Sequence, residues 1–161
     1  MQDIMQDRYK FKIWDKTEKK FLPLDSKTEN TDSWISIDNT GVYLVERDNA
    51  RDVAFFTDIT EDVIILQCTG LKDKNDKLIY EGDIVKYFCP AEYCSDGLHK
   101  CPECYSGENG SVHYDEDLAM YEYRSKSGEC PLTDNINTEE DLEIIGNIYE
   151  NPELLEIGVL A

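Results

Sequence analysis

Four closely spaced cysteines are the residues of this chain whose types and spacing could do chemistry. They form two pairs, Cys89 with Cys94 and Cys101 with Cys104, and the second pair has the Cys-Pro-Glu-Cys order of a zinc knuckle. Two residues between thiolates let one tight turn direct both sulfurs at a single cation. The spacing therefore predicts one structural Zn²⁺, with Cys89, Cys94, Cys101 and Cys104 as its ligands.

The looser first pair leaves other states of these thiols open. Four residues separate Cys89 from Cys94, and six residues lie between the two pairs, which is a short arm for closing a tetrahedron. His99 or Cys130 could replace one thiolate as a ligand. Free surface thiols and a redox pair are the alternatives to zinc. A structural ion would order this segment and would not imply catalysis.

No other group of residues forms a recognisable catalytic motif. His99 and His113 could act as acid or base groups, but neither has a Ser, Cys or carboxylate partner in a known sequence arrangement. The chain has no Gly-rich phosphate loop, nucleophile elbow or metalloprotease helix. We therefore expect a protein that is not an enzyme. A metal-dependent hydrolase built on the two histidines and the thiolates ranks last among the functions considered.

The charge of the chain restricts its partners. Among 161 residues, 35 Asp and Glu stand against 16 Lys and Arg, and the formal net charge is -19. Such a field repels phosphate backbones and anionic lipid surfaces, so we expect no direct nucleic-acid binding and no membrane binding. The 40% hydrophobic content and 10 Tyr supply enough apolar surface for a folded domain. No signal peptide and no membrane-spanning run are recognisable, which predicts a soluble, unexported protein.

Short β-strands must position these residues. Trp34–Ile37, Gly41–Val45 and Val53–Phe56 are β-branched or aromatic runs separated by turn residues, at the spacing of a meander. Val63–Leu66 shows no alternation, and we expect this strand to be buried on both faces. Cys68 follows it and is expected to be a small core residue.

Two later segments complete the expected elements. Residues 111–114 and 118–123 are predicted to form a hairpin around an acidic turn. Asn151 followed by Pro152 is typical of a helix start, so residues 152–157 are expected to form a short helix. Trp14 and Trp34 belong either to the core or to the lining of a ligand groove, and the core is the more frequent place for such residues.

Three segments carry a resemblance to a known family. Gln67–Tyr87 is a near-continuous signature, Arg8–Lys20 contains an opening strand with a Trp-Asp-Lys turn, and Ile144–Leu155 closes the pattern. Together, in this order, they resemble the YopX family of phage and prophage proteins. The sequence departs from that pattern at Asn75-Asp76, where an Asn-Gly turn is expected; Asp tolerates a positive φ less well than Gly does.

The resemblance implies a mainly β fold. The expected architecture is a small SH3-like β-barrel with inserted hairpins and a short C-terminal helix. It implies a single domain over residues 1–161, with a Cys-rich insertion at about 89–130. A phage or prophage origin places the protein in the cytoplasm of a bacterial host. The family brings no assigned activity and no catalytic residues.

The function expected from these observations is that of a non-enzymatic phage or prophage accessory protein. It would act as a β-barrel module that binds an as yet unknown protein partner, and a homo-oligomer stays open. The alternative is an acidic nucleic-acid mimic that inhibits a DNA-handling protein, and its support is the net charge of -19. Screening by salt would separate the two, because a charge mimic loses its partners as ionic strength rises.

Overall fold

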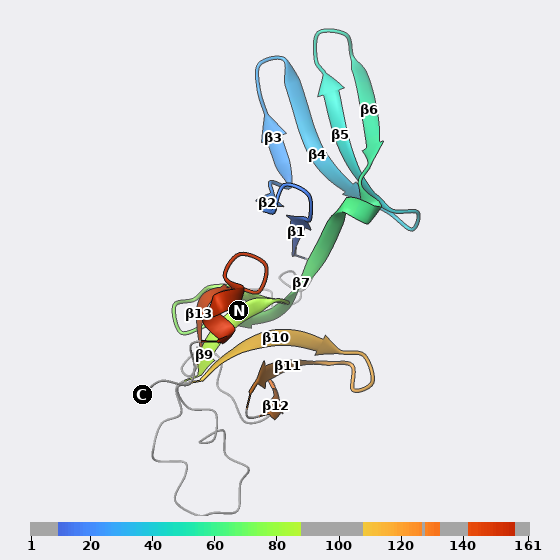
Figure 1. The fold of residues 1–161 in the computed structure, drawn as a ribbon. Coiled ribbons are helices and arrows are strands. Elements are labelled where there is room, and N and C mark those ends of the chain that lie inside the picture. The colour runs from blue at the N-terminus through green and yellow to red at the C-terminus, as the bar shows by residue number, and fades with distance from the viewer. Residues whose placement is uncertain (1–9, 88–107, 127, 133–141, 157–161) are drawn as a thin grey trace, which may run out of the picture. The chain divides into compact units, whose positions relative to one another are not determined.

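A computed structural model of this chain describes residues 10–87, 108–126, 128–132 and 142–156 (Figure 1). Most of these residues lie in strands, which confirms the mainly β fold. The chain divides into two compact units: an N-terminal unit, Lys12–Ile65, and a C-terminal unit, Leu66–Ala161 together with residues 1–11. The single domain that the sequence predicts over residues 1–161 stays a prediction.

The N-terminal unit carries a four-stranded antiparallel sheet in the order β3-β4-β5-β6, and the antiparallel pair β1-β2, which belongs to a second four-stranded sheet in the order β2-β1-β7-β8. The three strands expected as a meander are confirmed as β4, β5 and β6. The elements are β1 (Phe11–Asp15), β2 (Lys20–Leu22), β3 (Asp25–Lys27), β4 (Thr31–Ile37), β5 (Val42–Asp48), β6 (Val53–Asp58) and the 3-10 turn η1 (Thr60–Asp62), followed by the start of β7 (Val63–Lys72).

Aspartates at strand ends form the tight connections of this unit. A short carboxylate can accept the backbone N–H groups two and three residues further on, which closes a turn without a partner strand. The Thr40 hydroxyl and N–H lower the pKa of Asp38, and the Thr60 N–H lowers the pKa of Asp58. Part of the acidic excess therefore serves turn formation. The N–H donors lie 2.7–3.0 Å away, from Thr17 and Glu18 to Asp15, Thr40 to Asp38, Ala50 to Asp48 and Thr60 to Asp58.

The C-terminal unit contains a five-stranded half-barrel sheet in the order β12-β11-β10-β9-β13 and the hairpin formed by β7 with β8. The expected hairpin over residues 111–123 is confirmed as β10 and β11. Residues 109–131, which the sequence analysis assigns to an insertion, supply three strands of this sheet. The elements are β8 (Leu78–Tyr80), β9 (Asp83–Tyr87), β10 (Asn109–Asp115), β11 (Met120–Ser125), β12 (Gly128–Pro131), β13 (Leu142–Asn147) and the 3-10 turn η4 (Pro152–Leu155).

The core of the C-terminal unit lies on one face of this sheet. Cys130 belongs to it, with 8% of its surface exposed, and Cys68 is 1% exposed, which confirms it as a small core residue. Neither thiol is in a disulfide. Burial of such side chains removes apolar surface from water and supplies the main driving force for this sheet to fold. The central cluster is made of Ile79, Val85, Tyr87, Val112, Tyr123, Cys130, Leu132 and Leu142.

Two buried carboxylates join the signature hairpin to the closing motif of the family. Asp73, 1% exposed, accepts the Ile144 N–H at 3.0 Å on β13. Asp83 is equally buried and accepts the side-chain amide of Asn147 at 3.2 Å. Between them, Gly82 adopts φ +76°, and an added Cβ would also meet the Tyr149 ring at 3.3 Å. These residues of the family signature therefore hold the fold together.

The structure corrects two local predictions at this hairpin. Ile65 is 40% exposed, whereas Leu66 is 2% exposed, so the expectation that β7 is buried on both faces there is wrong. The turn is also displaced. The Asp76 N–H donates to Asp73 O at 2.9 Å, which makes Lys74 and Asn75 the central residues. Asp76 follows with φ 63°, so the expected positive φ occurs at the expected residue.

Two further predictions concern the C-terminal helix and the SH3-like barrel. Residues 152–155 form a single 3-10 turn after Asn151, where the sequence predicts a short helix reaching residue 157. The closure of the sheets into an SH3-like barrel stays a prediction. Within the described ranges, no helix has the length and apolar character needed to cross a membrane.

Candidate functional site

The four predicted zinc ligands, Cys89, Cys94, Cys101 and Cys104, lie outside the described residues, and the zinc site stays a prediction. Within the described residues, no cluster of three or more His, Cys, Asp or Glu is placed to hold a metal ion. Cys130, considered as a replacement ligand, lies in the core of the C-terminal unit, where burial raises the pKa of its thiol. A thiol in that environment is a poor source of thiolate.

His113 has a partner that the sequence did not reveal. Its Nε2 lies 2.7 Å from the Ser111 hydroxyl, two residues earlier on the same face of β10. Burial lowers the pKa of His113, and the Arg124 charge lowers it further. Ser111 is only 5% exposed, so its hydroxyl is not presented to a substrate as a nucleophile must be. Ser111 and His113 thus satisfy each other's hydrogen-bonding groups in a partly buried position, which is a structural role. His99 lies outside the described residues.

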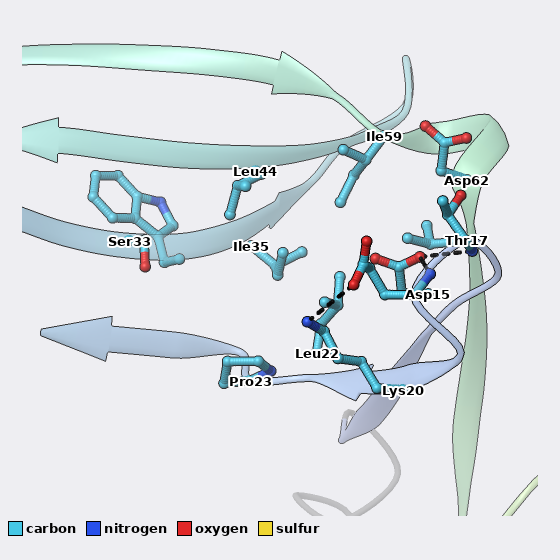
Figure 2. Close-up of a pocket in the computed structure, with 13 residues that line it drawn as sticks. Asp15, Thr17, Lys20, Leu22, Pro23, Ser33, Ile35, Leu44, Ile59 and Asp62 are labelled. Carbon is cyan, nitrogen blue, oxygen red and sulfur yellow. Dashed lines mark hydrogen bonds and ion pairs between the residues drawn. The ribbon is translucent and has the colours of Figure 1, made fainter. Parts of the chain in front are cut away.

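The N-terminal unit contains a groove of about 430 Å³ (Figure 2). This volume lies within the range of about 300–1,000 Å³ that is usual for ligand pockets. The groove combines residues from the β1-β2 turn, β2, β4, β5 and η1, so it exists only because these segments fold together. It is lined by Asp15, Thr17, Glu18, Lys20, Leu22, Pro23, Ser33, Trp34, Ile35, Leu44, Ile59, Asp62 and Val63.

The floor of the groove is apolar. Ile35 and Leu44 are paired across β4 and β5, so their side chains lie on the same face of the sheet. Figure 2 shows these two and Ile59 on the side that faces Leu22. All four side chains are half-buried. Trp34 also lines the groove, but side chains alternate along β4, so its ring lies on the opposite face of the sheet from Ile35. The floor therefore offers apolar surface that an incoming side chain could cover.

The rim of the groove is acidic. Asp15 Oδ1 accepts two N–H groups of its own turn, and the Lys16 N–H donates to Asp62 O at 2.9 Å, which brings this turn next to η1. Within the described parts of the chain, neither Asp15 Oδ2 nor the Asp62 carboxylate has a hydrogen-bond or ion-pair partner. The one cation of the lining, Lys20, lies 3.8 Å from Glu18. The rim thus presents negative charge without a matching cation.

Strand β6 forms a second exposed feature, here called the β6 edge (Val53–Asp58). Among the described strands, it is the last of its sheet and pairs with β5 alone (Figure 1). All six of its residues are exposed, with Phe55 at 57%, Phe56 at 68% and Val53 at 44%. Within the part of the chain that the structure describes, one side of this strand leaves backbone N–H and C=O groups without a neighbouring strand. The β6 edge thus exposes large apolar side chains beside an open hydrogen-bonding edge.

The sequence predicted the strands of this unit and offered Trp14 and Trp34 as core or groove residues, but it located neither the groove nor the β6 edge. Trp14 is 5% exposed and packs edge-on against Phe21 at 5.1 Å between ring centroids, so it is a core residue. Trp34 lines the groove. The Trp-Asp-Lys turn was recognised in the sequence, and it contains the rim residue Asp15. The contact of this turn with Asp62 could not be predicted from local spacing, because the two segments are far apart in the sequence.

Comparison with known proteins identifies the family of this chain. No curated protein matches the chain. Among solved structures, the crystal structure of protein EF1440 from Enterococcus faecalis is similar, with a TM-score of 0.46 and 22% sequence identity, and the match covers 91% of this chain and 96% of that chain. The family model described as YopX protein matches residues 10–156, which is most of the chain. On this match, which agrees with the three motif segments, the chain belongs to the YopX family.

Proposed function

We propose that this protein is a non-enzymatic accessory protein of phage or prophage origin that binds a partner protein through the β6 edge. Membership of the YopX family supports the origin. The observation that carries the binding role is the exposure of Phe55 and Phe56 on an edge strand. Soluble proteins normally shorten, charge or cover such an edge, because it is a template for pairing with another chain.

Strand addition is the binding mode that fits this geometry. An extended segment of the partner would satisfy the open backbone groups of β6 and continue the sheet. Phe56 lies on the face of Val45, its register partner, whereas Phe55 lies on the face of Glu46. The two rings therefore anchor the partner strand from both sides. Complete burial of one such ring is worth about 1.5–3 kcal/mol.

A charge mimic of nucleic acid is the second candidate, because the net charge of -19 would suit the basic groove of a DNA-handling protein. The two proposed functions predict different effects of salt on partner binding. Apolar contacts on the β6 edge persist as ionic strength rises, whereas contacts made by exposed charges weaken over a Debye length of about 10 Å at 0.1 M salt. The identity of the partner class can thus be read from one titration.

The test is capture of host proteins by the immobilised full chain at low and high salt. Compared with the wild type, the double variant Phe55→Ser/Phe56→Ser should lose a specific partner by at least about tenfold, which corresponds to about 1.4 kcal/mol. Leu118→Ser is the matched control, because Leu118 is also 57% exposed but lies in the C-terminal unit.

Three results are informative. Capture that survives high salt and disappears in the β6 variant supports strand addition. Capture that is released by salt and is equal in all three proteins supports the charge mimic. Capture that is independent of both salt and the β6 variant contradicts both proposals. Thermal unfolding of each variant checks that the fold is retained, and exposed substitutions of this kind usually change stability by within about 0.5 kcal/mol.

A further inference from the structure

The geometry points to a second binding site on the N-terminal unit. We propose that the groove receives a Lys or Arg side chain, flanked by apolar residues, from an extended segment of a partner protein. The groove and the β6 edge are different surfaces, and this proposal does not depend on strand addition at β6. It assigns a ligand chemistry to the groove from its lining alone.

The apolar floor selects the flanking residues of the ligand. Leu22, Ile35, Leu44 and Ile59 are half-buried and leave apolar surface facing the open groove. The long aliphatic stem of Lys or Arg can lie along such surface while its charged end reaches the rim. A neighbouring Leu, Ile or aromatic residue would cover the rest of the floor.

The acidic rim selects the charge of the ligand. Asp15 keeps one carboxylate oxygen and Asp62 keeps its whole carboxylate without a partner among the described residues, while Glu18 already has Lys20 at 3.8 Å. A cation entering the groove would gain charge-assisted hydrogen bonds that nothing within the described parts of the unit supplies. Arg suits this site especially, because its planar group can donate to two carboxylates in fixed directions.

The same rim disfavours other ligand classes. Phosphates, nucleotides and acidic peptides would meet three carboxylates, of Asp15, Glu18 and Asp62, against one lysine. The net charge of -19 extends this preference beyond the groove, because it attracts basic segments and accelerates their association. A wholly apolar ligand would cover the carboxylates and leave them desolvated without a partner, which is costly. A mixed basic and apolar segment avoids both costs.

The experiment selects ligands from a displayed library of random short peptides on the full chain. Selected peptides should contain Lys or Arg beside Leu, Ile or aromatic residues, and synthetic copies should bind the wild-type protein in solution. The variant Asp15→Asn/Asp62→Asn should bind these peptides at least about tenfold more weakly. Asn keeps the side-chain oxygen that closes the Asp15 turn, so the fold should persist.

Matched variants separate this site from general charge and from the β6 edge. Glu29→Gln/Asp38→Asn removes the same amount of charge from exposed positions of the N-terminal unit outside the groove lining, and it should bind as the wild type does. Phe55→Ser/Phe56→Ser should also retain peptide binding, so failure of strand addition and failure of this proposal are distinguishable.

The proposal is overturned by any of three results. The library returns no binder, the selected peptides carry no cation, or Asp15→Asn/Asp62→Asn binds them no more weakly than Glu29→Gln/Asp38→Asn does. The last result would mean that the peptides respond to overall charge and not to the groove.

Discussion

At the scale of single residues, Asp73 shows how a charged side chain can be structural in a strongly acidic protein. Its two oxygens accept N–H groups of Asn75 and Lys77 at 2.9 and 3.0 Å, and that of Ile144 at 3.0 Å. Burial alone would raise the pKa of Asp73, but the N–H groups of Ile144, Lys77 and Asn75 outweigh it and lower the pKa below 3.8.

We predict that Asp73→Asn lowers the free energy of unfolding by about 1–3 kcal/mol at neutral pH, because an amide presents one oxygen where the carboxylate presents two. Chemical denaturation of the wild type and the variant measures this difference. Asp117→Asn, an exposed turn residue, is the control and should change stability by less than about 0.5 kcal/mol. Equal midpoints for wild type and Asp73→Asn would show that the buried carboxylate adds nothing.

The pH dependence of Asp73 has a definite sign. Its pKa is lowered on folding, so its contribution is complete above the unfolded-state pKa near 3.8 and is lost as the pH falls through the lower folded-state pKa. The stability gap between wild type and Asp73→Asn should therefore be constant from neutral pH to about pH 5 and shrink below about pH 4. Unfolding curves at each pH would show a gap that widens in acid if the sign is wrong.

At the scale of elements, β7 shows how two adjacent residues of an apolar run differ in environment. Ile65 is 40% exposed and Leu66 is 2% exposed, as expected for side chains that alternate between opposite faces of a strand. The absence of sequence alternation in Val63–Leu66 was thus a poor guide to burial, because an apolar residue can also occupy an exposed face.

We predict that Ile65→Asp and Leu66→Asp have opposite outcomes. Ile65→Asp leaves its carboxylate in contact with water and should cost no more than about 1 kcal/mol. Leu66→Asp buries a charge without a partner and should cost several kcal/mol, comparable to the stability of a whole domain. Expression, solubility and thermal unfolding of the two variants provide the comparison. An insoluble Ile65→Asp protein would contradict this prediction and would indicate that β7 is buried on both faces at this position.

At the scale of the whole molecule, the net charge is -19, and several lysines of the described residues lie next to acids. Lys74 lies 2.8 Å from Glu143, Lys72 lies 2.5 Å from Asp76, and Lys20 lies near Glu18. Binding of a phosphate backbone requires clusters of cations that can release counterions. The lysines in these pairs are already neutralised by their neighbours.

We predict that the isolated protein binds duplex DNA more weakly than the usual non-specific range of about 10⁻⁴–10⁻⁶ M at physiological salt. Fluorescence anisotropy of a labelled duplex measures this, with a basic DNA-binding protein of similar size as the positive control. A micromolar dissociation constant with a steep dependence on salt would contradict the prediction.

The sequence alone determined the strands and hairpins that form between neighbouring segments of the chain. Strands β4, β5 and β6, and the hairpin of β10 with β11, follow from short apolar runs separated by turn residues, because strand pairing between sequence neighbours depends on local chemistry. The positive φ at Asp76 follows in the same way from the tolerance of Asp for that conformation. The motif segments also identified the YopX family. They contain the buried residues Asp73 and Asp83, whose hydrogen bonds to Ile144 and Asn147 stabilise the fold.

Only the tertiary structure decided which surfaces remain exposed. The position of β6 at the end of its sheet exposes Phe55 and Phe56, although their sequence is typical of a core strand. The groove requires Asp15, Ile35 and Asp62 to meet from three separate segments. Both features depend on contacts between residues distant in the sequence, and local periodicity carries no information about such contacts. The apolar pattern specified the strands, and their order in the sheet decided what they present to a partner.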